Sequence, residues 1–513
     1  MEEMIKKINE LAKVVSLKDQ EISYLKGQLD LLKKMIFASK KERFIPDPIG
    51  VKPLFDENQN LSDNTSSEEK KETEVKSHTR RGKRAPVPKD LPRIRQEFDL
   101  PENEKICSEH NIALQKIGEE SVEKLDIIPA SIQIIEQITF TYKCPCCDGK
   151  FVKSQRDPDP IPKSVASPGL LAYIAISKYA DSLPLHRQEK IFSRYGLTLD
   201  RTTMARWMIA CGNLVVPLIN LMTEDLQDSE VIHVDETSMQ VLKEPNRRAE
   251  QMSYIWCMAR SGPVPIVVYK YYDNRGKKAA AEFLDGCHGI VVADAYKVYS
   301  VLANVMNFVL AGCMAHCRRK FFDAYKLLKK EGRNYDDKKI LAEVALSFIK
   351  TLYSIERRVK SESHEIILKV RQEESVPILA EFHAWLLATE PLVLAKSHIG
   401  KAIKYALNQW DKLIVFSKNG KVPIDNNFVE GKFRPFVIGR NNWMFATSTE
   451  GAHASARMYS LVESAKANEV DPYDYLRLIF KELPKSKSVE DYEKLLPHKV
   501  RDHFKLKTYE VTS

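Results

Sequence analysis

Two acidic residues interrupt apolar runs that are typical of buried β-strands. Asp235 follows the run VIHV, and Asp294 follows the run IVVA. A carboxylate in a buried strand is costly unless it is paired or bound to a cation, so two such acids indicate a shared metal site. Oxygen ligands of this kind favour Mg²⁺ or Mn²⁺. For either acid alone, a carboxylate that caps the turn after a strand would be the simpler interpretation.

A third acid, Glu430, lies in a segment that is dense with polar, aromatic and basic residues. Asn426 and Asn427 precede it by about one helical turn, and Arg434 follows it by about one turn. A helix would therefore place carboxylate, amide and cation on one face. By this pattern alone, Glu430 is one acidic helix residue among several.

Two pairs of metal-ligating residues stand at the spacing of a tight turn. Cys107 and His110 form one pair, and Cys144 and Cys147 form the other. Together they make the Cys₃His set of a closed tetrahedral zinc site, which leaves no open position for a substrate. The alternating apolar runs between the pairs predict a small sheet that a structural zinc would stabilise. The alternatives are incidental cysteines, or a site in which Cys146 replaces a neighbouring ligand.

A further group of possible ligands comprises Cys313, His316 and Cys317, in the predicted helix AHCRRKFFDAYK and just before it. No second complete ligand pair accompanies them in the sequence. We therefore interpret them as one face of a helix without a metal.

Length and charge limit the class of protein. The chain has 513 residues, which predicts two to four folded units, and its formal charge of +9 carries meaning only where cationic residues cluster. No run approaches the roughly 18 apolar residues of a membrane helix, and the first residues lack the apolar core of a signal peptide. Nine cysteines, several at metal-ligand spacing, fit a reducing compartment. We expect a cytoplasmic protein without a membrane partner.

The elements before the zinc pairs predict self-association and a cationic arm. Residues 1–40 carry a heptad repeat in which every seam position except Lys18 is apolar, which predicts a coiled coil between subunits of a homo-oligomer. The alternative is an amphipathic helix packed on its own chain. Residues 41–98 read as a disordered linker that ends in a basic arm. Its cationic side chains would lie along DNA phosphates or remain a solvated charge run, and they include Arg80, Arg81, Lys83 and Arg84.

The zinc module is assigned to residues 99–152, and residues 160–224 after it read as helices. Within them, a helix, a Gly-containing turn and a second helix resemble a helix-turn-helix, with Asp200 as the N-cap of the second helix. That helix would present Arg201 and Arg206 to a DNA groove. An ordinary helical hairpin inside a larger domain is the alternative.

Residues 228–455 follow an α/β pattern with a mixed sheet. Three successive strands are predicted within residues 231–273, followed by a helix over 277–286, a strand over 289–299 and a strand over 307–313. A largely helical insertion over about 326–420 separates these strands from Glu430. Residues 456–513 read as a C-terminal helical tail.

Five motifs in this order closely resemble the transposases of the insertion-sequence 66 family: VDET, VADAYKVY, CMAHCRRKF, DNNFVEGKFRPFVIGRNNWMFA and SLVESAKANEVDPYDYLR. The resemblance implies a multidomain α/β protein with a ribonuclease-H-like core and an Asp-Asp-Glu triad, which maps onto Asp235, Asp294 and Glu430. It also implies a zinc-binding knuckle and, as substrates, terminal inverted repeats and target DNA. The resemblance further implies a bacterial protein that associates with the nucleoid when it is bound to DNA and that works with accessory proteins of the same element.

Two divalent ions held by these three carboxylates would activate water or a 3′-hydroxyl for phosphodiester displacement. The candidate contacts to phosphates or bases are His316, Arg318, Arg319, Lys320, Arg434, Arg440 and Trp443. A nuclease that does not join ends, a catalytically silent DNA-binding regulator and a zinc-containing scaffold are the alternatives. The presence of all three acids disfavours the regulator.

Overall fold

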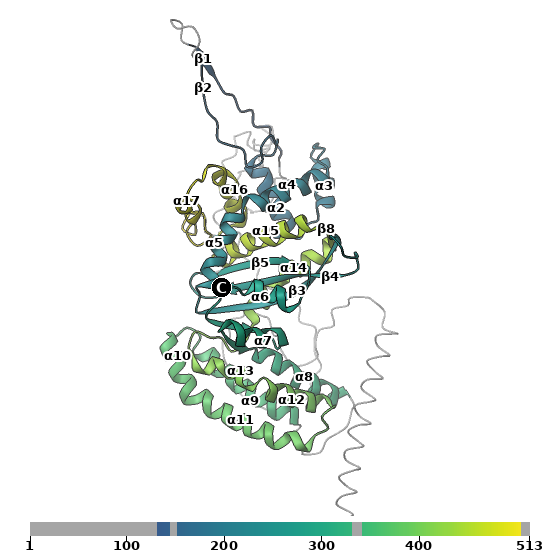
Figure 1. Cartoon of the computed structure of the whole chain (residues 1–513), viewed down its shortest axis with the longest axis vertical. Coiled ribbons are helices and arrows are strands. Elements are labelled where there is room, and N and C mark those ends of the chain that lie inside the picture. Colours follow the sequence, from purple (N-terminus) through teal and green to yellow (C-terminus); the bar gives the residue numbers. More distant parts are fainter. Residues whose placement is uncertain (1–130, 144–150, 331–340, 504–513) are drawn as a thin grey trace, which may run out of the picture. The chain divides into compact units, whose positions relative to one another are not determined.

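The computed structural model describes residues 131–143, 151–330 and 341–503 (Figure 1). The predicted coiled coil over residues 1–40 and the basic arm within residues 41–98 lie outside these ranges. The four predicted zinc ligands also lie outside them: Cys107, His110, Cys144 and Cys147. These interpretations therefore stay predictions.

A short antiparallel hairpin brackets the second zinc pair. Strand β1 (Thr141–Lys143) pairs with β2 (Phe151–Lys153), with Lys143 opposite Phe151. Residues 131–140 before β1 have no regular structure. The small sheet predicted between the zinc pairs is thus represented, in the described residues, by β1 alone.

A six-stranded mixed sheet forms the centre of the described chain, in the order β5-β4-β3-β6-β7 with β8 also beside β3. Strands β3, β4 and β5 are antiparallel neighbours, whereas β6 and β7 continue the sheet in parallel. This confirms the predicted mixed α/β pattern. The bounds are β3 (Val231–Lys243), β4 (Met252–Arg260), β5 (Ile266–Tyr272), β6 (Ile290–Ala293), β7 (Val309–Gly312) and β8 (Phe445–Ser448).

The pleat of β6 divides the apolar residues between two cores. Val291 and Ala293 belong to one cluster of buried side chains, whereas Val292 belongs to the other. Successive side chains in a strand point to opposite faces, so a continuous apolar strand serves two cores at once. Figure 1 shows the sheet between two helical regions, which supply the rest of these cores.

The first helical region comprises helices before the sheet and helices near the C-terminal end of the chain. Ser167 caps α2 by accepting a hydrogen bond from the N–H of Leu170, and Asp471 caps α16 in the same manner. The bounds are α2 (Pro168–Tyr179), α3 (Leu185–Arg194), α4 (Arg201–Leu214), α5 (Val216–Gln227), α16 (Pro472–Glu482), a 3₁₀ turn η5 (Leu483–Lys485) and α17 (Val489–Glu493).

Two helices connect the strands of the sheet, α6 (Lys277–Phe283) and α7 (Lys297–Met306). The strand predicted over residues 289–299 is too long, because β6 ends at Ala293 and α7 begins at Lys297. The chain must leave the sheet in order to return to it in parallel as β7, and a helix makes that crossover. Asn307, in the left-handed region with φ 59°, ends α7.

Helices α14 (Asn427–Trp443) and α15 (Thr449–Ala467) follow the insertion and pack against the sheet. The predicted boundary between residues 455 and 456 falls inside α15. This helix is no tail: the hydroxyls of Ser460 and Ser464 accept hydrogen bonds from the N–H groups of Tyr269 and Val267 in β5. Small side chains allow this close contact between helix and strand.

Helix α15 also packs closely on α4, and Gly212 makes this possible. A Cβ atom at Gly212 would lie 2.6 Å from the Cβ of Ala454. We expect Gly212→Ala to lower the free energy of unfolding by about 1–3 kcal/mol, because the two helices must separate. Urea denaturation measures this difference. Gly431→Ala is the matched control in the interior of α14, because a Cβ there has no atom within 4 Å; an equal loss in both variants would contradict the packing argument.

The second helical region contains the residues between β7 and α14. In the described residues it is entirely helical, in agreement with the predicted insertion, and it packs its own core against Val292 and Ala311 of the sheet. The bounds are α8 (Met314–Lys330), α9 (Leu341–Arg358), α10 (His364–Val370), a π-helical turn η2 (Arg371–Ser375), α11 (Val376–Thr389), η3 (Glu390–Leu392), α12 (His398–Asn408), α13 (Trp410–Leu413) and η4 (Val415–Lys418).

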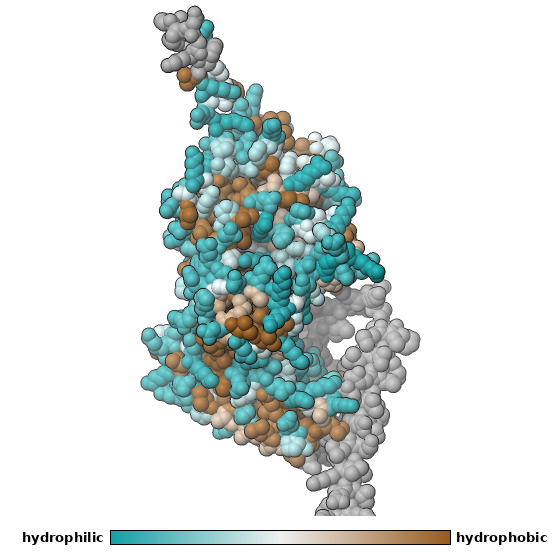
Figure 2. Space-filling model, viewed as in Figure 1, coloured by the Kyte–Doolittle hydropathy of each residue, from teal (hydrophilic) through white to brown (hydrophobic). Residues whose placement is uncertain are grey.

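The face shown in Figure 2 is largely hydrophilic, with a group of apolar side chains over α7. Exposed valines in these elements include Val301 and Val305 of α7 and Val309 of β7. Within the described ranges, no single helix is long and apolar enough to cross a membrane. The pair α4 and α5, bent by 49°, meets that test only when both helices are taken together.

Candidate active site

The strand register places Asp235 and Asp294 side by side. His233 of β3 lies opposite Val292 of β6 in the parallel ladder, and each aspartate follows that pair by two residues. An offset of two along an extended chain returns a side chain to the same face of the sheet. Asp294 directly follows the end of β6, so from the register we infer that both carboxylates project to one face. The sequence pattern found each aspartate separately, but only the register brings them together.

Both aspartates accept hydrogen bonds from the chain that follows them. Asp235 Oδ1 accepts from the N–H of Glu236 at 2.9 Å, and Asp294 Oδ1 accepts from the N–H of Tyr296 at 2.9 Å. Burial raises the pKa of Asp235 to about 8, and the charges of Glu236, Asp294 and Glu430 add to the increase. The site thus concentrates negative charge where water is largely excluded, which is the environment that a cation stabilises.

Asn426 joins the start of α14 to β3 and so positions Glu430. Its Nδ2 donates to the carbonyl of Val234 at 2.9 Å, and its Oδ1 lies 2.9 Å from Nδ1 of His233. Burial lowers the pKa of His233 to about 4, so the imidazole is neutral and donates from Nδ1 to the amide oxygen. Glu430, in the first turn of α14, is thereby held near enough to β3 for its charge to contribute to the raised pKa of Asp235. The sequence marked Asn426 only as a neighbour of Glu430.

The other end of α14 is also fastened to β3. Arg440 donates to the hydroxyl of Thr237 at 3.1 Å and to the carbonyl of Ser238, and burial lowers its pKa. Trp443 packs edge-on against Phe436, and the ammonium group of Lys178 lies over the Trp443 ring. Arg440 and Trp443, predicted as DNA contacts, thus have partners within the fold, and contact of either side chain with DNA stays a prediction.

Two cationic or titratable side chains of α8 face the carboxylate of Glu430. His316 Nδ1 lies 3.6 Å from Oε1, and Arg319 Nη2 lies 3.6 Å from Oε2. Half of the Arg319 side chain is exposed to solvent. Both residues were predicted as DNA contacts, and the structure places them beside the third acid.

Glu236 is an acid of this region that the sequence interpretation missed. It follows Asp235 and points to the opposite face of β3, where Arg275 donates to it at 2.6 Å and the Tyr299 hydroxyl at 2.5 Å. Burial raises its pKa, although Tyr299 and Arg275 oppose the shift. The rule that selected Asp235, a carboxylate in a buried strand, applies equally to Glu236. Its partners within the fold give it a structural role.

The helix pair predicted to bind DNA is present as α3 and α4. Asp200 occupies the N-cap position of α4, without a side-chain hydrogen bond to the helix. Arg201 and Arg206 are exposed on the N-terminal half of α4, whereas its C-terminal half packs on α15. The remaining predicted contacts comprise two exposed residues, Lys320 and Arg434, and the partly buried Arg318. DNA contact by these side chains stays a prediction.

The raised pKa of Asp235 predicts a pH-dependent stability in protein without divalent cations. The folded state raises the pKa from its ordinary value of 3.8 to about 8, so the stabilisation is complete below pH 3.8 and is lost as the pH rises through 8. Asp235→Asn does not ionise and escapes this loss. We expect its Tm in EDTA to exceed that of the wild type by roughly 3–6 °C at pH 8 and to converge with it near pH 4.

Thermal unfolding followed by fluorescence at both pH values measures this crossover. Asp294→Asn serves as the comparison, because it removes a neighbouring charge but leaves Asp235 able to ionise. Equal Tm values for the wild type and Asp235→Asn at pH 8 would show that the carboxylate of Asp235 is not destabilised by its surroundings.

Four family models match the chain. The model described as "Transposase IS66 family" matches residues 163–454, and "IS66 C-terminal element" matches residues 460–498. The "zinc-finger binding domain of transposase IS66" matches residues 104–148, and "Transposase C of IS166 homeodomain" matches residues 24–95. The first match alone spans more than half of the chain, and it contains all three acids of the candidate site.

Three proteins of Sinorhizobium fredii are similar over most of their length, and each is named as an uncharacterized protein. The protein y4jD is 31% identical over 424 residues, which are 80% of this chain and 81% of the relative. For y4qI the identity is 32% over 436 residues, 81% of this chain and 78% of the relative. For y4hP the identity is 29% over 417 residues, which are 78% of this chain and 74% of the relative. No solved structure matches the chain.

Proposed function

The chain belongs to the transposase IS66 family, and we propose that it cuts and joins DNA at the ends of an insertion sequence with Asp235, Asp294 and Glu430. The single observation that supports this proposal most strongly is the shared register of the two aspartates, together with the attachment of α14 that brings Glu430 to them. A transposase of an insertion sequence acts on DNA, so the terminal inverted repeats and the target DNA are the proposed substrates.

The topology of the sheet supports the proposed ribonuclease-H-like core. Three antiparallel strands are followed by two parallel strands, and the candidate acids lie on the central strand β3, at the end of the neighbouring β6, and on a helix that crosses β3. The helical insertion lies between the second and third acids, where the resemblance to the family places it.

The donor set fits Mg²⁺ or Mn²⁺. Asp235, Asp294 and Glu430 offer only carboxylate oxygens, which these cations prefer. Burial, together with the charges of the neighbouring acids, raises the pKa of Asp235, and a bound cation would offset both effects. Two divalent ions, when bound, would activate the attacking hydroxyl and stabilise the leaving oxygen of an in-line displacement. The chain's own contribution is to fix three carboxylates on rigid elements.

The neighbouring residues support this positioning. Asn426 attaches α14 to β3 at the N-terminal side of Glu430, and Arg440 attaches it further along the helix. Arg319 lies close to Glu430 and is half exposed, so it can contact a DNA phosphate that enters the site. Exposed Arg201 and Arg206 of α4 extend the proposed DNA-binding surface.

The segments outside the described residues supply further proposed functions. The match to a zinc-finger model supports a structural zinc within residues 104–148, and we propose Cys107, His110, Cys144 and Cys147 as its ligands. We also propose that residues 1–40 join subunits and that accessory proteins of the same element take part in the reaction.

The test is cleavage and joining of labelled DNA that carries the element's own ends, with Mg²⁺ or Mn²⁺ and with EDTA as the control. We expect both nicked ends and joined products in the presence of the cation. Cleavage without joining would favour a nuclease, and tight binding of the ends without cleavage, with the accessory proteins added, would favour a silent regulator.

A further inference from the structure

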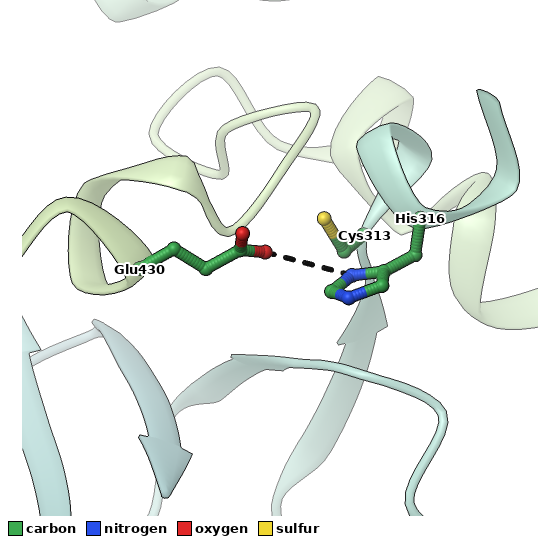
Figure 3. A group of neighbouring side chains, drawn as sticks. All are labelled: Cys313, His316 and Glu430. Atoms are coloured by element: carbon green, nitrogen blue, oxygen red, sulfur yellow. Dashed lines mark ion pairs between the residues drawn. The ribbon is translucent and has the colours of Figure 1, made fainter. Parts of the chain in front are cut away.

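Three ligand-type side chains meet beside the proposed catalytic acids. Cys313 follows β7, His316 lies in the first turn of α8, and Glu430 lies in the first turn of α14. Their thiol, imidazole and carboxylate ligand atoms all lie within 4.8 Å of one another. Figure 3 shows the Glu430 side chain reaching from α14 toward His316, with the Cys313 sulfur beside them.

Backbone contacts fix the two helix starts next to each other. The N–H of Met314 donates to the carbonyl of Ile424 at 3.1 Å, and the N–H of Asn426 donates to Sγ of Cys313 at 3.2 Å. The cluster therefore does not depend on the conformation of one exposed loop. Cys313, directly before α8, is 1% exposed, and His316 follows three residues later in the first turn of that helix.

Two of the ligand atoms lack a hydrogen-bond partner. Nδ1 of His316 and Oε1 of Glu430 are both buried and both without a partner in the described chain. They face each other at 3.6 Å, which is too long for a hydrogen bond. An unsatisfied buried nitrogen and carboxylate oxygen are costly, and a cation between them would satisfy both.

The spacing and the donor types suit a transition metal. Bonds of about 2.0–2.3 Å in a tetrahedral zinc site place its ligand atoms roughly 3.3–3.8 Å apart, so the 3.6 Å between His316 and Glu430 fits without adjustment. The thiol sulfur lies within 4.8 Å of both of these ligand atoms. Sulfur and imidazole ligands favour Zn²⁺ over Mg²⁺, which prefers oxygen.

We propose that Cys313, His316 and Glu430 are three ligands of a second transition-metal site, for Zn²⁺ or a cation of similar softness, with a fourth position open to water or DNA. Binding releases the thiol proton of Cys313 to solvent, and the resulting thiolate bonds to the cation. The site is separate from the predicted zinc module and shares Glu430 with the proposed catalytic set. The second oxygen of Glu430, which lies 3.6 Å from Arg319, could still ligate a cation held by Asp235 and Asp294.

This inference reverses our interpretation of Cys313 and His316 as a helix face without a metal. The sequence offered no complete second ligand pair, because the third ligand, Glu430, lies more than a hundred residues further along the chain. Cys317, the other cysteine of the motif, is fully buried among apolar side chains of the insertion and does not belong to the cluster.

The test measures metal content rather than DNA cleavage, so its result does not depend on the proposed function. Full-length protein is prepared with zinc, freed of loosely held metal and measured by mass spectrometry of the elements. We expect about two zinc ions per chain in the intact protein, and about one in Cys313→Ser and in His316→Ala. Cys317→Ala is the matched control, a neighbouring thiol of the same helix, and should retain both ions.

Co²⁺ substitution identifies the ligands. In a variant with Cys107→Ser and Cys144→Ser, which removes the predicted zinc module, added Co²⁺ should still give a thiolate-to-cobalt absorption band and tetrahedral visible bands. Cys313→Ser should abolish the thiolate band. The side chain of His316 is partly exposed, so His316→Ala should stay folded. Thermal unfolding of this variant tests whether its lower metal content results from misfolding.

Equal zinc content in the intact protein, Cys313→Ser and His316→Ala would overturn the proposal. So would cobalt spectra that do not change with Cys313. In either case a direct contact between His316 and Glu430, without a metal, would be the correct description of the cluster.

Discussion

We expect Asp235→Asn, Asp294→Asn and Glu430→Gln each to lower the rate of DNA end cleavage by roughly 10³-fold or more, while the affinity for the ends changes little. Each amide keeps the volume of the acid and most of its hydrogen bonds but removes the charge that a divalent cation needs. If the three acids act as one unit, as we propose, a double variant should be about as inactive as a single one. Gel analysis of labelled ends gives the cleavage rate, and filter binding gives the affinity.

Glu236→Gln is the matched control for this prediction. It also replaces a buried acid of β3, but on the opposite face, where Arg275 and Tyr299 hold the carboxylate. We expect it to lower stability and to reduce cleavage by less than about 10-fold at temperatures well below its Tm. Cleavage that survives in the three acid variants, or that disappears equally in Glu236→Gln, would show that the active site is assigned wrongly.

Arg371→Met lowers the free energy of unfolding by about 3–5 kcal/mol, the largest stability effect that we expect in the helical insertion. The side chain of Arg371 is 3% exposed and forms a double hydrogen bond with Glu356, at 2.8 and 2.5 Å. Its Nη1 also donates to the carbonyls of Phe416, Asn419 and Val422, at 2.7–2.9 Å. Methionine fills the space but leaves Glu356 and three carbonyls without their donor.

Urea denaturation measures this loss, and Arg358→Met is the control. Arg358 also pairs with a glutamate, Glu374, but its side chain is 58% exposed, so water replaces the lost partner and the loss of stability should be much smaller than in Arg371→Met. Equal costs in the two variants would contradict the view that Arg371 fastens the π-helical turn to the end of the insertion. A loss of DNA cleavage in Arg371→Met at low temperature would further show that the insertion positions Glu430.

The sequence by itself determined the features that depend on neighbouring residues. The apolar runs before Asp235 and Asp294 identified two strands and two unusual carboxylates, because a charge in a buried strand is costly unless a partner or a cation stabilises it. The period of the apolar residues also marked the helical insertion and the pair α3 and α4. These signals lie within one element, so they can be read from its own residues.

Other features required the tertiary structure, because they join residues that are distant along the chain. The pairing of His233 with Val292 decides that the two aspartates share a face, and no single strand contains that information. The bonds from Asn426 to β3 decide where Glu430 lies, and those from Ser460 and Ser464 to β5 turn a predicted tail into a helix of the core.

The same reason explains the errors and omissions at the site. Glu236 satisfies the rule for a buried acid, but only its contacts with Arg275 and Tyr299 separate it from Asp235. Cys313 and His316 have metal-ligand spacing in the sequence, but their third partner comes from another helix. Residue types and spacing thus determine which side chains can do chemistry, whereas strand register and helix packing decide which of them meet, since contacts between distant segments form only in the folded chain.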